Sequence, residues 1–330
     1  MNYVSLPVHT QPQIVAGQVR NFCHYFPDAT VVLHVSLQAR FEIKTLEMAL
    51  QRGQCQNVLV NSTRASTAWG SILQAHLANV AYIRKRGDAG AICLHASNDM
   101  LVRKGVAAYL ARGRNFCQRR IVHPGTFWRF GNAALADTCL AKLRQQLGGV
   151  DVVASQIEGS CYEAGLLFEI ADLVATMPPL PAPIAYPREE VWLSTLAHGL
   201  RAQIDGKPYV FSELHRFDRV FWNVLRHVNP LIGQDSAASE FIRRSIEYVM
   251  IKSGFHRIDR SWVDSVARDD MKRLLPYQTL SDGNNIWTIF ERHGLFGVKR
   301  VPRRTNSPLR AYIDAQAAKE APGLTSDSGI

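Results

Sequence analysis

The stretch AICLHASNDM, residues 91–100, decides how the rest of the chain is interpreted. Its apolar run ends at Leu94, small and polar residues follow, and a carboxylate comes at Asp99. A short apolar run bounded in this way is typical of a strand buried in a parallel sheet. Ligands of such sheets bind beyond the carboxyl ends of the strands. The sequence therefore predicts that Asp99 lies at the ligand edge of an α/β fold.

The first half of the chain alternates between strand-like and helix-like segments. β-branched or apolar runs predict strands at 3–9, 29–36, 57–61 and 91–95. Apolar residues at helical spacing predict helices at 12–26, 41–53 and 69–83, with a shorter one near 104–112. Repeated βα steps of this kind predict a mixed, mostly parallel sheet with helices on both faces.

The second half is more helical and contains no internal repeat. Helical patterns cover 133–147, 163–174, 187–203, 217–227, 237–252 and 261–274. The tail from about Asp314 ends in small and polar residues and is expected to fray. We expect one domain over 1–313, with a nucleotide-binding half at about 1–115 and an acceptor-binding, helical half at about 116–313.

Composition is that of a globular protein that folds unaided. The 330 residues are 47% hydrophobic and 20% charged, and no apolar run approaches the roughly 20 residues that cross a bilayer. The N-terminus lacks a basic segment followed by an apolar core, so we expect a cytoplasmic protein. The six cysteines form no C-x-x-C pair and are expected to be buried thiols.

A formal net charge of +10 points to an anionic partner. Nucleic acid, an anionic membrane surface and a phosphorylated substrate all fit that charge. The only dense cluster is KRVPRR, residues 299–304. A nucleic-acid-binding module would show a basic stripe interleaved with aromatic residues, or a known motif, and neither is visible. We therefore expect no nucleic-acid partner, although a basic nucleic-acid-binding protein is the alternative that charge alone supports.

Several common chemistries are disfavoured because their motifs are absent. The chain has no G-x-G-x-x-G after its first strand, no G-x-x-x-x-G-K-[ST], no H-E-x-x-H and no G-x-S-x-G. It also lacks Asp-x-Asp, the pair of carboxylates with which many sugar-nucleotide enzymes hold a metal on a diphosphate. If a diphosphate binds here, basic side chains must neutralise it.

Three segments, taken together and in this order, resemble the core-2/I-branching β-1,6-N-acetylglucosaminyltransferase family, which includes peptide O-xylosyltransferases. The first runs from RASTAWGSILQAHLANVAYI (64–83) to AICLHASNDMLVRKG (91–105). The second is YPREEVWLSTL (186–196), and the third is ERHGLFGVKRV (291–301). The chain departs from the family at Ser36, where an Asp is common, and at Met100, which stands in place of a Pro.

The resemblance implies a GT-A-like, Rossmann-type fold and metal-independent, inverting sugar transfer. The expected donor is a UDP-sugar, with GlcNAc or xylose plausible, and no cofactor or divalent metal is expected. The expected acceptor is a glycan or lipid-linked saccharide in bacterial surface polysaccharide synthesis. The protein could then sit peripherally at an anionic inner-membrane surface. A catalytically inactive sugar-nucleotide-binding relative is a further alternative.

Inverting transfer needs a carboxylate that accepts the proton of the acceptor hydroxyl. Matching the second segment to the family through Thr195 places this base at Glu190, next to Glu189. Successive helical residues point about 100° apart, so only one of the two can face the site. Both could instead be first-turn acids that favour the positive end of a helix dipole.

The resemblance also assigns donor contacts. Lys299 matches the family's diphosphate-binding lysine, with Arg300 and Arg303 close by, although this cluster could be a solvated basic patch. Asp99 would accept hydrogen bonds from the donor, or could cap the following helix. The remaining expected donor contacts, which could equally be structural, are Val8, His9, Arg64 and Ser71.

The segment QIEGSCYEAG (156–165) interrupts an apolar strand with a charged residue and a glycine. It suggests a turn at the border of an acceptor pocket, where Glu158 and Tyr162 could bind acceptor hydroxyls. An ordinary strand-to-helix turn would look the same.

Overall fold

The computed structural model spans residues 1–330. The residues that the structure describes are 1–67, 70–124, 126, 128, 130–178, 185–212, 224, 227–228, 231–232, 236–254, 257–274, 279–281 and 285–320. Of the helix expected at 217–227, only Val224 and His227 are among the described residues.

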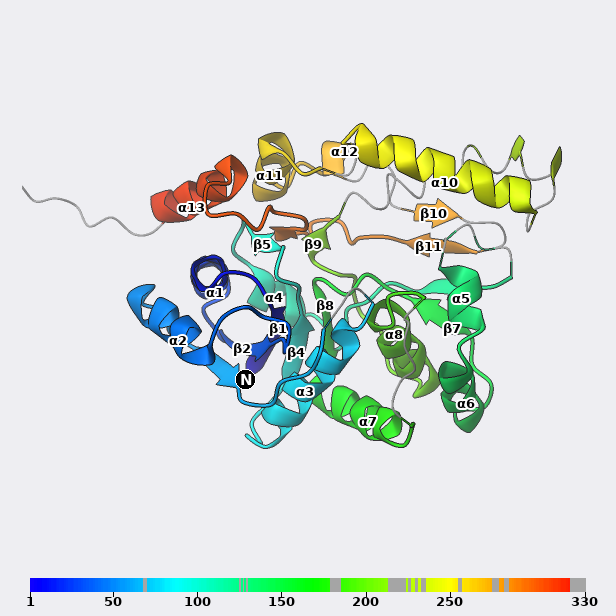
Figure 1. The fold of residues 1–330 in the computed structure, drawn as a ribbon, viewed down its shortest axis with the longest axis horizontal. Coiled ribbons are helices and arrows are strands. Elements are labelled where there is room, and N and C mark those ends of the chain that lie inside the picture. The colour runs from blue at the N-terminus through cyan, green and yellow to red at the C-terminus, as the bar shows by residue number, and fades with distance from the viewer. Residues whose placement is uncertain are drawn as a thin grey trace, which may run out of the picture.

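A five-stranded sheet in the order β3-β2-β1-β4-β8 forms the centre of the molecule (Figure 1). Strands β1 to β4 run parallel, and β8 is antiparallel to β4. The bounds are β1 Asn2–Val8, β2 Ala29–Val35, β3 Val58–Asn61, β4 Ala91–Leu94 and β8 Ser160–Glu163. The expected mixed, mostly parallel sheet is confirmed.

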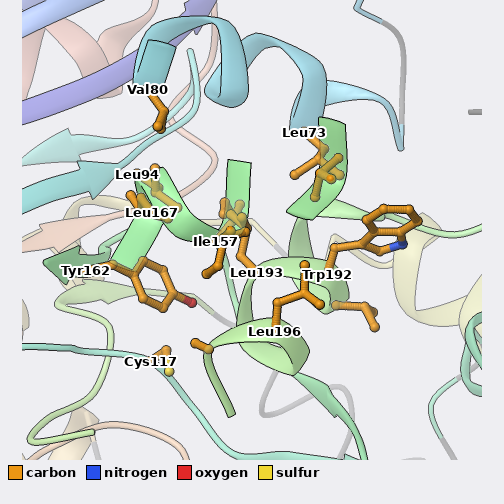
Figure 2. Packing of buried hydrophobic residues seen from close by; sticks show 14 of the residues in the cluster. Leu73, Val80, Leu94, Cys117, Ile157, Tyr162, Leu167, Trp192, Leu193 and Leu196 are labelled. Atoms are coloured by element: carbon orange, nitrogen blue, oxygen red, sulfur yellow. The ribbon is translucent and has the colours of Figure 1, made fainter. Parts of the chain in front are cut away.

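Helices cover both faces of this sheet, and a separate core lies on each face. On one side, α1 (Pro12–Tyr25) and α2 (Ile43–Arg52) pack on Val4, Leu6 and their neighbours. On the other, α3 (Ile72–Arg84) and α7 (Ala164–Ala175) pack with Tyr3 and the apolar residues seen in Figure 2. Because successive strand residues face opposite sides, β1 is buried along nearly its whole length.

A smaller sheet joins three distant parts of the chain beside the carboxyl end of β4. Its order is β5-β12-β9, with bounds Met100–Leu101, Gly297–Val298 and Val210–Phe211. A third core of apolar residues lies on this sheet and includes Phe211, Phe290 and Val298. The pairing of β12 with β5 brings the basic segment 299–304 to the ligand edge of the central sheet.

The other elements lie mostly in the second half of the chain. They are α4 Val106–Leu110, β6 Arg120–Val122, α5 Gly131–Leu135, α6 Thr138–Gln146, β7 Val152–Ala154, α8 Glu189–Gly199, α10 Ala237–Lys252, α11 Arg260–Ala267, α12 Met271–Leu274, β10 Thr279–Ser281, β11 Ile286–Thr288 and α13 Pro308–Glu320. Strands β6 and β7 pair with each other, as do β10 and β11.

Two long helices expected from the sequence are each divided. The segment 133–147 is interrupted at Asp137, whose carboxylate accepts from the backbone N–H groups of Cys139 and Leu140 and so starts α6. The segment 261–274 is interrupted at Asp269, whose φ of 57° is incompatible with a continuous helix. Local periodicity does not reveal such breaks, because the apolar spacing continues through them.

The tail was expected to fray from about Asp314, and this is wrong for 314–320. Helix α13 continues to Glu320 because it packs on α1 (Figure 1) and buries Leu309 and Ile313.

The six cysteines are free thiols, and Cys93, Cys117, Cys139 and Cys161 are buried. Within the described residues, no helix combines the length and apolar character that crossing a membrane requires.

Candidate functional site

The carboxyl end of β1 meets the C-terminal basic segment. Val8 is buried, and the exposed His9 follows it. The Arg303 side chain reaches this end of the strand: its Nε donates to Ser97 O over 3.3 Å, and its Nη1 lies 3.5 Å from His9 Nε2. Burial, and then the nearby charge of Arg303, lowers the pKa of His9, so the imidazole is neutral at pH 7.

Arg64 and Ser36 lie at the end of β2 and are held by the protein itself. The Arg64 guanidinium donates to the backbone oxygens of Val35 and Ser36, at 3.3 and 2.6 Å. The Ser36 hydroxyl donates to Gln38 Oε1 over 2.6 Å. Ser71 is the residue before α3 and makes no side-chain cap hydrogen bond. The expected contacts of Arg64 and Ser71 with a donor stay predictions.

Asp99 lies inside the protein, behind the ligand edge of the sheet. The sequence predicted that it would lie on that edge. It is fully buried and accepts hydrogen bonds from Ala96 N and Gln18 Nε2, at 3.2 and 3.1 Å. Its other close partner is His95 Nδ1, 2.8 Å from Oδ2. The Asp99 carboxylate is thus enclosed and hydrogen-bonded inside the protein, and its expected contact with a donor stays a prediction.

The hydrogen bonds of Asp99 continue through His95 to Tyr209. If His95 donates from Nδ1 to Asp99, its Nε2 accepts from the Tyr209 hydroxyl, 2.6 Å away. His95 is fully buried, and Tyr209 is too. This closed chain ties the end of β4 to the segment that forms β9, and its role is to hold the edge of the sheet in place.

Lys299 lies inside the protein and is paired with Glu158. Their side chains are almost completely buried, and Lys299 Nζ lies 2.6 Å from Glu158 Oε2. The turn that carries Glu158 is held by the Gln156 side chain, which donates to Glu158 O over 2.6 Å. A buried pair of this kind adds little net stability, but losing one partner would leave the other charge uncompensated. Glu158, expected at an acceptor, is here the counter-ion of Lys299.

Glu189 belongs to the same buried cluster. It lies in the first turn of α8 and is 4% exposed, and its Oε2 has no hydrogen-bond partner among the described residues. Burial is the main reason that the pKa of Glu189 is raised to about 8. A hydrogen bond from its own backbone N–H lowers that pKa, Glu190 and Glu158 raise it, and Lys299 lowers it.

Glu190 faces different surroundings, as the helical spacing predicted. It is half-buried and lines a small pocket with a free volume of about 70 Å³. The other lining residues are Gln118, Arg120, Trp128, Ala154, Ser155, Gln156, Ser212, Leu280, Trp287, Ile289 and Phe290. The Arg120 guanidinium lies over the rings of Trp128 and Trp287, 5.6 and 4.6 Å from their centres. The pocket thus combines aromatic walls with a carboxylate.

Tyr162 is in the core. It is 1% exposed and points from β8 into the apolar cluster that α3, α7 and α8 share (Figure 2). Because side chains alternate between the two faces of a sheet, the Tyr162 side chain lies on the face that α3 and α7 cover. Tyr162 is thus enclosed by the core in this structure, and its expected contact with an acceptor stays a prediction.

Some residues around these groups carry no sequence signal. Trp128 and Trp287 come from unrelated segments and look like ordinary core residues until β6 and β11 are placed. Arg257 lines a second pocket together with Arg300 and Arg303, which only the tertiary structure reveals. Among the described residues, no three His, Cys, Asp or Glu side chains gather where a metal ion could be held.

No family model matches the chain, and no curated protein matches it. Among solved structures, the galactosyltransferase LgtC in complex with donor and acceptor sugar analogues is similar at 8% identity and a TM-score of 0.44, covering 98% of each chain. A nucleoside-diphosphate-sugar pyrophosphorylase from Vibrio cholerae RC9 is similar at 11% identity and a TM-score of 0.34, covering 61% of this chain and 87% of that one.

Proposed function

We propose that this protein is a GT-A-like, metal-independent, inverting glycosyltransferase that moves a sugar from a UDP-sugar to a glycan. GlcNAc and xylose are the proposed sugars, as the family resemblance implies. The observation that carries the proposal is the buried cluster of Lys299, Glu158 and Glu189. This cluster brings together two of the segments that resemble the family, 186–196 and 291–301, which are far apart in sequence. They meet beside the carboxyl edge of the sheet.

The proposed base is Glu190. In this reaction the acceptor hydroxyl attacks the anomeric carbon as a carboxylate takes its proton, and the nucleotide leaves from the opposite face. With a pKa of about 8, Glu189 holds its own proton at pH 7 and cannot accept another. Glu190 instead lines an open pocket with Trp128 and Trp287, whose rings suit the apolar face of a sugar.

The positive charge needed by the leaving diphosphate is proposed to come from the basic segment 299–304. Preorganised cations at a leaving group act strongly in a site that excludes water. Within this segment Lys299 is held in place by Glu158, whose carboxylate also balances its charge. The proposed acceptor is a bacterial surface glycan or its lipid-linked precursor, and the net charge of +10 supports an encounter with an anionic membrane surface.

The test is hydrolysis and transfer with UDP-GlcNAc and UDP-xylose in the presence of EDTA. We expect turnover to persist with EDTA and to fall by about 10²-fold or more in Glu190→Gln, the usual contribution of a general base. Glu189→Gln should lose less, because it copies the protonated side chain. Glu169→Gln, exposed on α7, is the matched control.

Two outcomes would remove this proposal. Activity that EDTA abolishes would defeat metal independence, and full turnover by Glu190→Gln would exclude Glu190 as the base. Binding of UDP without any turnover would instead indicate an inactive relative that retains the sugar-nucleotide site.

A further inference from the structure

Helix α10 lies along one edge of the molecule, away from the central sheet (Figure 1). Among those of its side chains that the structure describes, only Met250 is buried. A helix of a globular protein usually gains most of its stability by burying an apolar face against a neighbour. The described side chains of α10 instead lie mostly in solvent.

Three large side chains on one side of α10 are exposed. Phe241 is 71% exposed, Tyr248 64% and Val249 62%. Residues that are seven and eight positions apart lie on the same side of a helix, because seven residues make almost two turns. Single exposed apolar residues are ordinary on a protein surface, whereas several gathered on one side of a helix indicate an interaction surface.

The same side of α10 carries positive charge. Arg244 follows Phe241 by three positions, Lys252 follows Tyr248 by four, and both basic residues are exposed. The Lys252 ammonium lies 5.6 Å from the centre of the Tyr248 ring. No Asp or Glu occurs among the exposed side chains that the structure describes in this helix. We call Phe241, Arg244, Tyr248, Val249 and Lys252 together the α10 face.

The composition of the α10 face favours a lipid surface over a protein partner. The centre of a protein–protein interface is depleted of lysine, whereas Lys252 lies beside Tyr248 within this face. Helices that lie in a membrane interface combine Lys and Arg with aromatic and apolar side chains. The rings and apolar groups enter the headgroup region while the cations meet anionic lipids. The net charge of +10 is complementary to such a surface.

We propose that the α10 face docks on an anionic lipid bilayer, with the helix axis parallel to the membrane and Phe241 and Tyr248 in the headgroup region. The helix has 16 residues and is about 24 Å long, so the whole face can meet the bilayer at once. Net charge indicates an anionic partner but not the surface that meets it, and α10 supplies that surface. Only the delivery of a lipid-linked acceptor by this membrane rests on the proposed function.

The experiment is sedimentation of the full chain with vesicles of phosphatidylcholine alone, or of phosphatidylcholine and phosphatidylglycerol in equal parts. The wild-type chain should bind the anionic vesicles much more tightly than the neutral ones. The double variant Phe241→Ser, Tyr248→Ser should weaken binding to the anionic vesicles by about 10-fold or more, because it removes both aromatic groups that would leave water. Met48→Ser changes an exposed apolar residue of α2 and is the matched control, with binding like wild type.

A second pair of variants tests the charge. A basic residue close to an anionic membrane contributes about fivefold to affinity, so Lys252→Gln should weaken binding by about that factor. Lys44→Gln, exposed on α2, is its control. High salt should weaken binding of the wild-type chain, because it screens the charges. The variants change exposed side chains, so their thermal melting by circular dichroism should match that of wild type.

Each result decides something about the α10 face. Failure of the wild-type chain to bind anionic vesicles would overturn the proposal, as would binding that the double variant leaves unchanged. A dimer that the double variant dissociates, with no binding to vesicles, would make this face an interface between two copies and overturn membrane docking. Vesicle binding by a chain that transfers no sugar would refute the proposed function alone. Transfer to a soluble acceptor by a chain that binds no vesicles would refute the docking surface alone.

Discussion

Glu158, Glu189 and Lys299 share one buried space, and burial there raises the pKa of Glu189. Glu158 is paired with Lys299 at 2.6 Å, whereas Glu189 Oε2 has no hydrogen-bond partner among the described residues. An ionised Glu189 would be poorly solvated and close to the carboxylates of Glu190 and Glu158, so Glu189 keeps its proton at pH 7. The buried cluster is therefore close to neutral in the absence of ligand.

This arrangement predicts how stability depends on pH. The pKa of Glu189 is about 8 in the folded chain, against an ordinary value of 4.5. Between these values the folded chain holds a proton that the unfolded chain has released, so the free energy of unfolding falls as pH rises. Glu189→Gln removes this dependence. Its stability relative to wild type should increase by a few kcal/mol between pH 5 and pH 8.5 in urea denaturation.

Glu169→Gln provides the reference for that measurement, because Glu169 is exposed on α7. Its stability difference from wild type should stay nearly constant over the same pH range. If Glu189→Gln and Glu169→Gln gave parallel curves, Glu189 would be ionised in the folded protein.

Among the elements, the turn that leads into β8 requires a glycine for two reasons, its positive φ and its close approach to another backbone. Gly159 has a φ of +80°, and an added Cβ would lie 2.6 Å from Val210 N and 2.9 Å from Tyr209 N. Its oxygen accepts from Tyr209 N over 3.1 Å. Only glycine lets these two backbones approach so closely, and this approach places Glu158 against Lys299.

We expect Gly159→Ala to destabilise the protein by about 1–3 kcal/mol or more, because it combines a strained φ with a backbone clash. Gly165→Ala is the matched control: it lies in α7, and no heavy atom would lie within 4 Å of its Cβ. That substitution should stabilise by about 0.5–1 kcal/mol. Thermal or urea unfolding compares the two, and equal effects would contradict the close approach at Gly159.

On the scale of the whole molecule, the two expected halves are interleaved. Strand β4 of the first half pairs with β8 of the second, and β5 pairs with β12 near the end of the chain. Helix α13 packs on α1. A boundary near residue 115 therefore cuts through both the central sheet and the small sheet.

It follows that the fragment 1–115 should not fold by itself, because the free edge of β4 and the apolar faces beneath α7 and α8 would be exposed. Circular dichroism on heating should show no cooperative transition for this fragment, and limited proteolysis should degrade it. The full chain should unfold cooperatively. A sharp melting transition of the fragment would show that residues 1–115 fold as an independent unit.

The sequence alone determined the four parallel strands of the central sheet and the helices that alternate with them, but not the antiparallel strand β8. Strands buried on both faces read as continuous apolar runs, and amphipathic helices read as a 3.6-residue repeat, so residues 1–94 were assigned almost to their ends. The different directions of the Glu189 and Glu190 side chains followed from helical geometry. The helix breaks at Asp137 and Asp269 could not be predicted from the sequence, because the apolar spacing continues through both positions.

Only the tertiary structure decided which side chains meet. Glu158 and Lys299 come from separate turns, Asp99 turns inward to His95, and Arg257 joins the basic segment from the approach to α11. A sequence pattern reports which face of its own element a residue occupies, because that depends on local backbone geometry. The partner of a buried charge depends instead on how distant elements pack, and that is set by the whole core.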